Sequence, residues 1–454
     1  MRIDILHTND IHSNVENLPK ASNYINQIRT ANQNTLLVDA GDMITGEFQF
    51  EYLKGSIESE IANYLNYDVV TVGNHDFDLG YEFLKSHMNR VNSQYVLSNM
   101  IDNQNQLSDY KDTYIIERDG VKIGFFSLIL PYIEQILEGA PGFDFVKPDH
   151  YSEIVNKLKE AGADIIVALN HQGFERDVKL AEMNIGVDII IGAHSHTELE
   201  GPHYVGQSLI VQTGCFAKNL GHLTIDYTDG KMSVIDYKLV NLNNYSQVDE
   251  QLQALIDSRL SDVLELGTKL YGTTISDLDG RREMTTKQST NLGSLVCDSY
   301  LTHVNELGYD VDFAFINSRG IRQSVTKGKI TKRDLYNVLP FGKKLIVSSI
   351  SGSNLKAALS LRTVEIQTTN LKLNKTVEEY KFYYLDESTP IEDDRIYKFV
   401  TVDYLYEHEL FPHLRSGELI KYNAGLDIEV LGNYISKLEP NFDYPNNQMV
   451  TSYE

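Results

Sequence analysis

Short apolar runs rich in β-branched residues alternate with amphipathic segments over roughly the first 240 residues, and this alternation most restricts the fold. The runs cover residues 2–6, 35–38, 68–72, 122–130, 164–169, 188–191 and 209–212. Continuous apolar runs of this length indicate strands that are buried on both faces. The intervening segments, such as residues 152–160 and 176–183, have helical spacing. The pattern predicts βα units in a layered α/β domain.

The chain of 454 residues is too long for a single hydrophobic core. Apolar residues recur at helical spacing over residues 246–270, which predicts one long helix that connects two domains. From Tyr271 onward, helical and strand patterns are mixed, as in an α+β domain. We therefore predict a catalytic domain over residues 1–243, a linker helix over 244–270 and a substrate-binding domain over 271–454.

The acidic composition restricts the partners of the chain. Its net charge of -24 argues against binding to a nucleic acid polymer or to an anionic membrane surface. A phosphate substrate remains compatible with this charge, because bound divalent cations reverse the local field. The opening sequence MRIDILHTND has no secretory apolar region, and no run approaches the ~20 apolar residues of a membrane span. A soluble cytoplasmic protein is expected.

Five polar clusters follow predicted strands in the first half. They are Asp10-Ile11-His12, Asp39-Ala40-Gly41-Asp42, Gly73-Asn74-His75-Asp76, Asn170-His171 and Gly192-Ala193-His194-Ser195-His196. Ligands of layered α/β folds bind outside the carboxyl ends of the strands, so the five loops are expected to converge on one site.

The residue types in these clusters suit two divalent metal ions. Carboxylate, imidazole and amide ligands together fit manganese, zinc, iron or cobalt. A single loop histidine is usually structural, and aspartates at strand ends usually cap turns, as we expect for Asp39, Asp68, Asp164 and Asp188. The ordered set of five clusters favours the metal interpretation over that alternative.

The motifs HTNDIHS, VDAGD, VGNHDFD, NHQG and GAHSH resemble those of the calcineurin-like metallophosphoesterases, and within them the two-domain 5′-nucleotidases. The resemblance implies roles for individual residues. The first metal would be held by Asp10, His12 and His196, and the second by Asn74, His171 and His194, with Asp42 bridging the two. His75 would face the phosphoryl group without binding metal, and Asp78 would pair with His75 and orient it.

The second half carries weaker signals. Taken alone, the arginines of the segment 317–322 predict a surface turn, and Phe341 predicts a core aromatic. The resemblance instead implies substrate-binding roles for five residues: Arg282, Asn317, Arg322, Phe341 and Tyr404. Phe341 and Tyr404 would stack on a nucleobase, and the arginines would bind anionic groups.

This half also departs from the family pattern. Thr286 and Arg319 replace an arginine and a glycine, and residues 403–411 lack the Gly-Gly-Asp-Gly loop of other members. The expected activity is hydrolysis of nucleoside 5′-phosphates. The alternatives are a phosphodiesterase or pyrophosphatase acting on cyclic nucleotides, nucleotide sugars or dinucleotides, and a non-catalytic protein that senses a nucleotide or metal.

Overall fold

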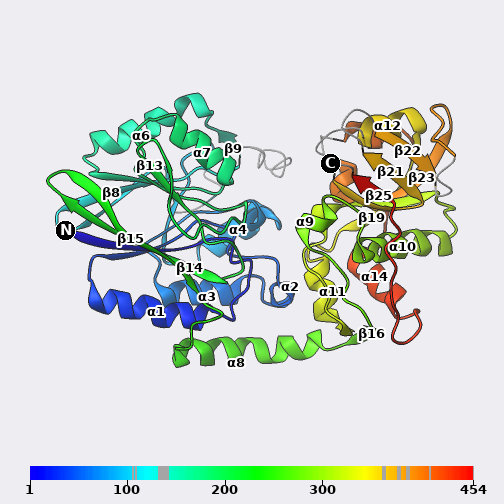
Figure 1. Ribbon diagram of the computed structural model, residues 1–454, viewed down its shortest axis with the longest axis horizontal. Coiled ribbons are helices and arrows are strands. Elements are labelled where there is room, and N and C mark those ends of the chain that lie inside the picture. The colour runs from blue at the N-terminus through cyan, green and yellow to red at the C-terminus, as the bar shows by residue number, and fades with distance from the viewer. Residues whose placement is uncertain are drawn as a thin grey trace. The chain divides into compact units, whose positions relative to one another are not determined.

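A computed structural model of the chain describes residues 1–104, 107, 110–130, 143–359, 365–375, 380–384, 389–407 and 411–452. The chain divides into two compact units, Met1–Ser261 and Asp262–Glu454. We call them unit 1 and unit 2 and describe each by itself (Figure 1).

Unit 1 is built from strands that alternate with helices. Its strands are β1 (Arg2–Thr8), β2 (Thr35–Asp39), β3 (Val69–Val70), β4 (Gln94–Val96), β5 (Met100–Asp102), β6 (Tyr110–Lys111), β7 (Tyr114–Arg118), β8 (Val121–Phe126), β9 (Phe143–Phe145), β10 (Ile165–Leu169), β11 (Ile189–Ile191), β12 (His203–Val205), β13 (Ser208–Val211), β14 (Asn219–Thr228) and β15 (Lys231–Asn241). Its helices are α1 (Leu18–Ala31), α2 (Phe48–Leu53), α3 (Ser56–Leu65), η1 (His75–Phe77), α4 (Tyr81–Met88), η2 (Pro148–His150), α6 (Tyr151–Glu160) and α7 (Phe174–Glu182), and α8 (Glu250–Gly267) starts in this unit.

Two sheets form the middle of unit 1. One has the strand order β15-β14-β1-β2-β3-β4-β6, and the other has the order β12-β13-β11-β10-β8-β7. Buried side chains from both sheets, including Ile5, Val38, Phe125 and Val167, form one core cluster. Helices α1 and α3 cover the outside of the first sheet, and α6 and α7 cover the outside of the second (Figure 1). The predicted layered α/β architecture is confirmed.

The candidate ligands follow strands of the parallel part of each sheet. Strands β1, β2 and β3 are parallel neighbours in the first sheet, and β10 and β11 are parallel neighbours in the second. Their carboxyl ends therefore meet at the same edge, and the loops that follow them share one end of the unit. The five polar clusters lie in these loops.

Two aspartates that directly precede strands bind a neighbouring strand instead of capping a turn. The Asp68 carboxylate accepts a hydrogen bond from the Leu37 amide (2.9 Å), and the Asp188 carboxylate accepts one from the Ile166 amide (2.8 Å). Each aspartate thus pairs with a backbone amide of the neighbouring strand, at the end of the sheet away from the polar clusters.

Unit 2 has mixed α and β structure. Its strands are β16 (Leu270–Thr274), β17 (Phe313–Asn317), β18 (Gly328–Thr331), β19 (Lys344–Ser351), β20 (Ile366–Thr369), β21 (Leu371–Lys375), β22 (Tyr380–Tyr384), β23 (Ile396–Val402), β24 (Leu419–Leu426) and β25 (Val450–Ser452). Its helices are α9 (Arg282–Thr285), α10 (Asn291–Glu306), η3 (Ser318–Gly320), α11 (Lys332–Val338), α12 (Gly352–Leu359), α13 (Asp403–Glu407), η4 (Pro412–Arg415) and α14 (Asp427–Ile435).

The central sheet of unit 2 has the order β20-β17-β23-β19-β24 and packs with α10 and α14 around one buried core. Two helices in this unit, α10 and α11, begin with side-chain caps. The Thr290 hydroxyl accepts the Gly293 amide at the start of α10, and Thr331 and Asp334 form a capping box at the start of α11. Among the described residues, no helix combines the length and the apolar content that crossing a membrane requires.

The division between the units falls inside α8. Asp249 begins this helix: its carboxylate accepts hydrogen bonds from the amides of Gln251 and Leu252, while its own amide donates to the Pro19 carbonyl of unit 1 (2.9 Å). The first half of α8 is thereby tied to α1. The domain limits at residues 243 and 271 stay predictions.

Candidate functional site

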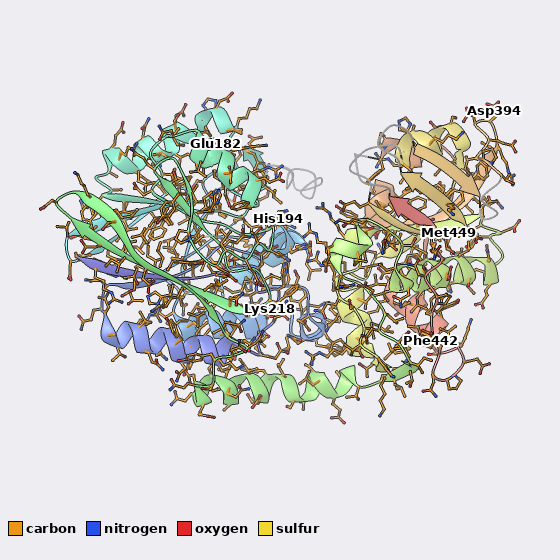
Figure 2. The ribbon with its side chains drawn as sticks, in the orientation of Figure 1. Glu182, His194, Lys218, Asp394, Phe442 and Met449 are labelled. Atoms are coloured by element: carbon orange, nitrogen blue, oxygen red, sulfur yellow. The ribbon has the colours of Figure 1, made fainter. Side chains whose placement is uncertain are left out.

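The loops that carry the polar clusters have unusual backbone geometry. Five non-glycine residues of the clusters themselves adopt positive φ angles, between 50° and 71°: Asp10, His12, Asp42, His194 and His196. L-residues avoid this conformation, and such strain persists only where the surrounding structure over-determines it, as at functional sites. The strained turns direct these side chains toward one region of unit 1. In Figure 2 the labelled His194 lies in this region, beside α4 and on the side of unit 1 opposite the N-terminus.

A first group of candidate ligands comprises Asp10, His12 and His196, whose possible ligand atoms lie within 4.8 Å of one another. The His12 Nε2 and His196 Nε2 atoms are 3.3 Å apart, and the Asp10 Oδ1 atom is 3.4 Å from His196 Nε2. Asp10 and His12 are buried, whereas His196 is partly exposed. Two imidazole nitrogens and one carboxylate that face a common point make a suitable set for a divalent cation.

A second group comprises Asp42, His171 and His194, again within 4.8 Å of one another. The His171 Nδ1 atom lies 2.8 Å from the Ala40 carbonyl, so its N–H donates to that oxygen and leaves Nε2 with its lone pair. This buried Nε2 atom has no hydrogen-bond partner in the described structure. An orphaned imidazole nitrogen 3.1 Å from the Asp42 Oδ2 atom fits a metal ligand.

Asn74 joins this second group. Its Oδ1 atom lies 2.8 Å from the His194 Nδ1 atom, so its amide oxygen faces the same space.

Asp42 connects the two groups. Its Oδ2 atom lies 3.6 Å from His12 Nε2 in the first group and 3.1 Å from His171 Nε2 in the second. One carboxylate oxygen therefore faces both sets of ligands. This is the position that a bridging ligand requires.

The charges at the site favour bound cations. Burial acts to raise the pKa of Asp10, but His196 and His171 outweigh it and lower the pKa to about 2. For Asp42 the same balance, with His171 as the main partner, holds the pKa well below its ordinary value. Burial opposes protonation of His171, yet Asp42 and Asp10 raise its pKa to about 10. The buried carboxylates are thus ionised. The positive charge that they require comes from a protonated His171, or from a metal ion that displaces this proton from Nε2.

His75 lies beside the ligand groups without belonging to either. Its ring is edge-on to that of His12, with 5.3 Å between the centroids, and its Nδ1 atom lies 2.8 Å from the Asp78 Oδ2 atom. Its backbone amide donates to the Asp42 Oδ1 atom (2.8 Å). The Asp78 contact fixes the ring orientation and leaves Nε2 as the other functional atom.

Two buried residues to which the sequence analysis gave no role organise these loops. The Asp76 carboxylate accepts hydrogen bonds from the amides of Asp42 (3.0 Å), Gly73 (2.8 Å) and Ile44 (3.3 Å). Asn9 donates to the Asp10 carboxylate (2.7 Å) and to the Gly214 carbonyl (2.7 Å). Both residues lie inside the family motifs, and this position was the sequence signal that could have pointed to them. Their roles depend on contacts with residues that are distant in the sequence.

Three of the five candidate substrate residues of unit 2 share one cationic and aromatic cluster. The Arg322 guanidinium lies 5.5 Å from the Phe341 ring centroid, and the Lys343 ammonium lies 5.5 Å from Phe341 and 5.4 Å from Tyr404. Phe341 is only partly buried and Tyr404 is 43% exposed, so neither ring is a core aromatic. Lys343 follows the Leu-Pro-Phe-Gly segment, and no sequence motif marked it as a candidate.

The other two candidates lie at element ends. Arg282 begins α9, Asn317 ends β17, and α9 packs against η3, which follows Asn317. Arg319, which replaces a family glycine, is paired on the surface with Glu365 (3.0 Å). Residues 408–410, from the segment that replaces the Gly-Gly-Asp-Gly loop, lie outside the described residues.

Comparison with known families matches both parts of the chain. The sequence profile described as "Calcineurin-like phosphoesterase" matches residues 3–198, and "5'-nucleotidase, C-terminal domain" matches residues 271–415.

Individual relatives span both parts. The chain is 28% identical over 523 residues to the 5'-nucleotidase of Mus musculus, covering 96% of this chain and 88% of that protein. It is 26% identical over 400 residues to the trifunctional nucleotide phosphoesterase protein YfkN of Bacillus subtilis, covering 79% of this chain but 27% of YfkN. The structure of a 5'-nucleotidase precursor from Thermus thermophilus has a TM-score of 0.90 at 23% identity, covering 100% of this chain and 99% of that chain. This last similarity establishes the fold.

Proposed function

The chain belongs to the two-domain 5′-nucleotidases of the calcineurin-like phosphoesterase family and is a metal-dependent phosphoester hydrolase; on this premise we propose that it hydrolyses nucleoside 5′-phosphates to a nucleoside and phosphate. The observation that carries the proposal is the pair of ligand groups that adjoin at Asp42. A site with two such groups suits phosphoester hydrolysis, because the substrate carries charge on both the attacked and the leaving side.

Asp10, His12 and His196 would hold one divalent ion, Asn74, His171 and His194 would hold the other, and Asp42 would bridge them. The orphaned Nε2 atom of His171 and the short separation of the His12 and His196 nitrogens support this assignment. Bound ions of this kind activate water and neutralise charge on the phosphoryl oxygens. Manganese, zinc, iron and cobalt all match the ligand types.

His75 would donate a hydrogen bond from Nε2 to the phosphoryl group or to the leaving oxygen. Asp78 would hold the proton on Nδ1, stabilise the charged imidazole and fix its orientation. The hydrogen bond from the His75 amide to Asp42 supports this role, because it fixes the residue against the ligand groups.

Phe341 and Tyr404 would stack on the nucleobase, while Arg282, Arg322 and Asn317 would contact polar or anionic groups of the substrate. Stacking suits this role because every base has an aromatic face. The partial exposure of both rings supports it, since a core aromatic is closed to a ligand from solvent.

A second candidate function has a wider substrate range that includes cyclic nucleotides, nucleotide sugars and dinucleotides. The similarity to YfkN, which is named a trifunctional nucleotide phosphoesterase, supports it, as does the missing Gly-Gly-Asp-Gly loop. A non-catalytic sensor is disfavoured. Such a protein would need neither His75 nor Asp78, because neither residue would hold a metal, and yet the chain has both.

A substrate panel after metal exchange tests the proposal. Exhaustive chelation should abolish turnover, and added Mn²⁺ or Co²⁺ should restore it. Among nucleoside 5′-monophosphates, 3′-monophosphates, cyclic nucleotides, a nucleotide sugar and a dinucleotide, the 5′-monophosphates should have the highest kcat/KM. A higher value for any other class would transfer the proposal to the wider phosphoesterase. Full turnover in protein that elemental analysis finds free of metal would refute both.

A further inference from the structure

Lys343 lies against both aromatic rings of the candidate base site. Its ammonium nitrogen is 5.5 Å from the Phe341 ring centroid and 5.4 Å from the Tyr404 ring centroid, over the face of each ring. Both distances fall within the cation–π range of about 6 Å. A single ammonium within reach of both faces ties the two rings to one site, so a base that stacks on either ring would lie next to it.

The backbone around Lys343 is fixed against the element that carries Tyr404. The Asp403 carboxylate accepts hydrogen bonds from the amide of Tyr404 (2.7 Å) and from the amide of Lys344 (3.1 Å), so it joins the start of α13 to the start of β19. On the other side, the Lys343 carbonyl accepts the Asp427 amide (2.9 Å) at the start of α14. The lysine therefore projects from a preorganised turn rather than from a free loop.

The ammonium offers only hydrogen-bond donors. Among the described residues Lys343 forms no salt bridge, so its N–H groups are available to a ligand acceptor. Nucleobases differ at the edge that would meet it. Hypoxanthine and guanine present the O6 acceptor, and uracil presents O4, at the positions where adenine and cytosine carry an amino donor.

We propose that Lys343 is a specificity-determining residue that selects nucleoside 5′-phosphates whose base presents a carbonyl oxygen at its edge. This inference rests on the proposed nucleotide activity and narrows its substrate class to the 6-oxopurine and 4-oxopyrimidine nucleotides. A carbonyl oxygen accepts from the ammonium, while an amino group meets a like donor and a positive charge. Hydrogen bonds to charged groups are strong, so kcat/KM for the oxo-base nucleotides should exceed that for the amino-base nucleotides by about ten-fold or more.

The test compares matched substrates in the full-length, metal-loaded protein. For the wild type, kcat/KM for inosine 5′-monophosphate should exceed that for adenosine 5′-monophosphate by about ten-fold or more. The kcat/KM for uridine 5′-monophosphate should exceed that for cytidine 5′-monophosphate by a similar factor. Lys343→Met should bring both ratios close to one. Lys343→Glu should invert them, because a carboxylate accepts from the amino groups. Lys344→Met is the control: this exposed neighbour lies over Tyr422 instead, and its loss should leave the ratios unchanged.

The outcomes separate the two proposals. A wild type that hydrolyses bis(p-nitrophenyl) phosphate but no nucleoside monophosphate overturns the nucleotidase function and this inference with it. A wild type that hydrolyses all four nucleotides with ratios near one overturns the inference alone, whether or not the variants fold. Oxo-base preference that survives in a folded Lys343→Met protein also overturns it.

Discussion

His75 and Asp42 are joined by a backbone hydrogen bond, yet their mutation should have different effects. His75→Ala should keep both metals and lose on the order of 10²–10³-fold in kcat, because it removes a donor to the transition state but no ligand. Asp42→Ala should lose metal, because its carboxylate faces both ligand groups. Elemental analysis of each purified variant, together with kcat, measures the two effects.

The chain offers a matched control for His75. His150 pairs with Glu153 at 2.8 Å and the same sequence spacing as His75 with Asp78, but it lies exposed on the surface. His150→Ala should therefore keep wild-type turnover. Metal loss in His75→Ala together with metal retention in Asp42→Ala would reverse our assignment of the two residues.

Phe341 permits a second residue-scale prediction. Phe341→Ala should raise KM for nucleoside 5′-phosphates by roughly ten- to a hundred-fold, because stacking on a base contributes about 1–3 kcal/mol. Hydrolysis of bis(p-nitrophenyl) phosphate, which has no nucleobase, should change little. Tyr422→Ala is the matched control, since Tyr422 is also a partly exposed ring with a lysine over it. Unchanged nucleotide kinetics in Phe341→Ala would contradict the stacking role.

The metal ligand candidates could be identified from sequence because each has a fixed local signal, a polar motif directly after an apolar run. The residues that organise them could not. Asp76 binds three amides from two loops, and Asn9 reaches Thr213 and Gly214, so their roles depend on contacts between distant segments. Lys343 also has no local sequence signal, because its proposed role depends on its contact with Tyr404, which lies on another element.

At the scale of elements, the turn after β3 depends on the small size of Gly73. A Cβ atom at this position would lie 2.1 Å from the Asp42 Oδ1 atom and 2.5 Å from the His171 Cε1 atom. Gly73→Ala should therefore displace both candidate ligands and weaken metal affinity by about 10–100-fold, as the loss of a supporting contact does. Metal titration measures this effect. Gly201→Ala, where an added Cβ meets nothing within 4 Å, should bind metal normally.

The start of α14 carries a buried carboxyl group that makes the stability of unit 2 depend on pH. Burial is the main cause that raises the pKa of Asp427 from 3.8 to about 8, and Asp403 adds to it. Between these two pH values the folded state keeps a proton that the unfolded state has lost. The contribution of this group to the free energy of unfolding should therefore fall as pH rises from about 4 to about 8 and then level off.

Asp427→Asn should reduce that fall, because an amide cannot ionise but keeps an oxygen for the Ile428 amide. Denaturant unfolding at pH 5 and pH 8 in the presence of a chelator measures the difference, with Asp393→Asn, at an exposed carboxylate, as control. An equal pH dependence in Asp427→Asn and the wild type would show that this group does not titrate as described.

Element identity was more predictable than element ends. The apolar run 122–130 indicates one strand, but β8 ends at Phe126. Beyond it, Ser127 donates to the Val96 carbonyl, and the amides of Leu128 and Ile129 donate to the side chains of Asn170 and Asn99. These hydrogen bonds to side chains replace the backbone hydrogen bonds that would continue the strand. Sequence periodicity detects burial, and burial continues past Phe126 after the strand has ended.

At the scale of the whole molecule, the two units are suited to different tasks. All the candidate metal ligands lie in unit 1, between residues 10 and 196, while the candidate base and anion contacts lie in unit 2, between residues 282 and 404. Each unit has its own buried core. Hydrolysis and substrate selection should therefore be separable by dividing the chain.

A fragment that ends at Ser261 should fold alone, bind two divalent ions and hydrolyse bis(p-nitrophenyl) phosphate while losing the preference among nucleotides. Ser261 is chosen because the first half of α8 belongs structurally to unit 1. The Ser22 hydroxyl donates to the Asp249 carboxylate (2.7 Å), and Arg259 pairs with Glu60 (2.9 Å). A shorter fragment ending at Leu242 loses these contacts. The partly buried Ser22–Asp249 hydrogen bond contributes about 1 kcal/mol, and the exposed Arg259–Glu60 ion pair contributes little.

The shorter fragment should therefore melt at a lower temperature while binding the same number of ions. Circular dichroism on heating and metal titration compare the two fragments. An unfolded Ser261 fragment would refute the autonomy of unit 1. A folded fragment with the nucleotide preference of the full chain would instead remove substrate selection from unit 2, because the Phe341, Lys343 and Tyr404 cluster would then be absent without consequence.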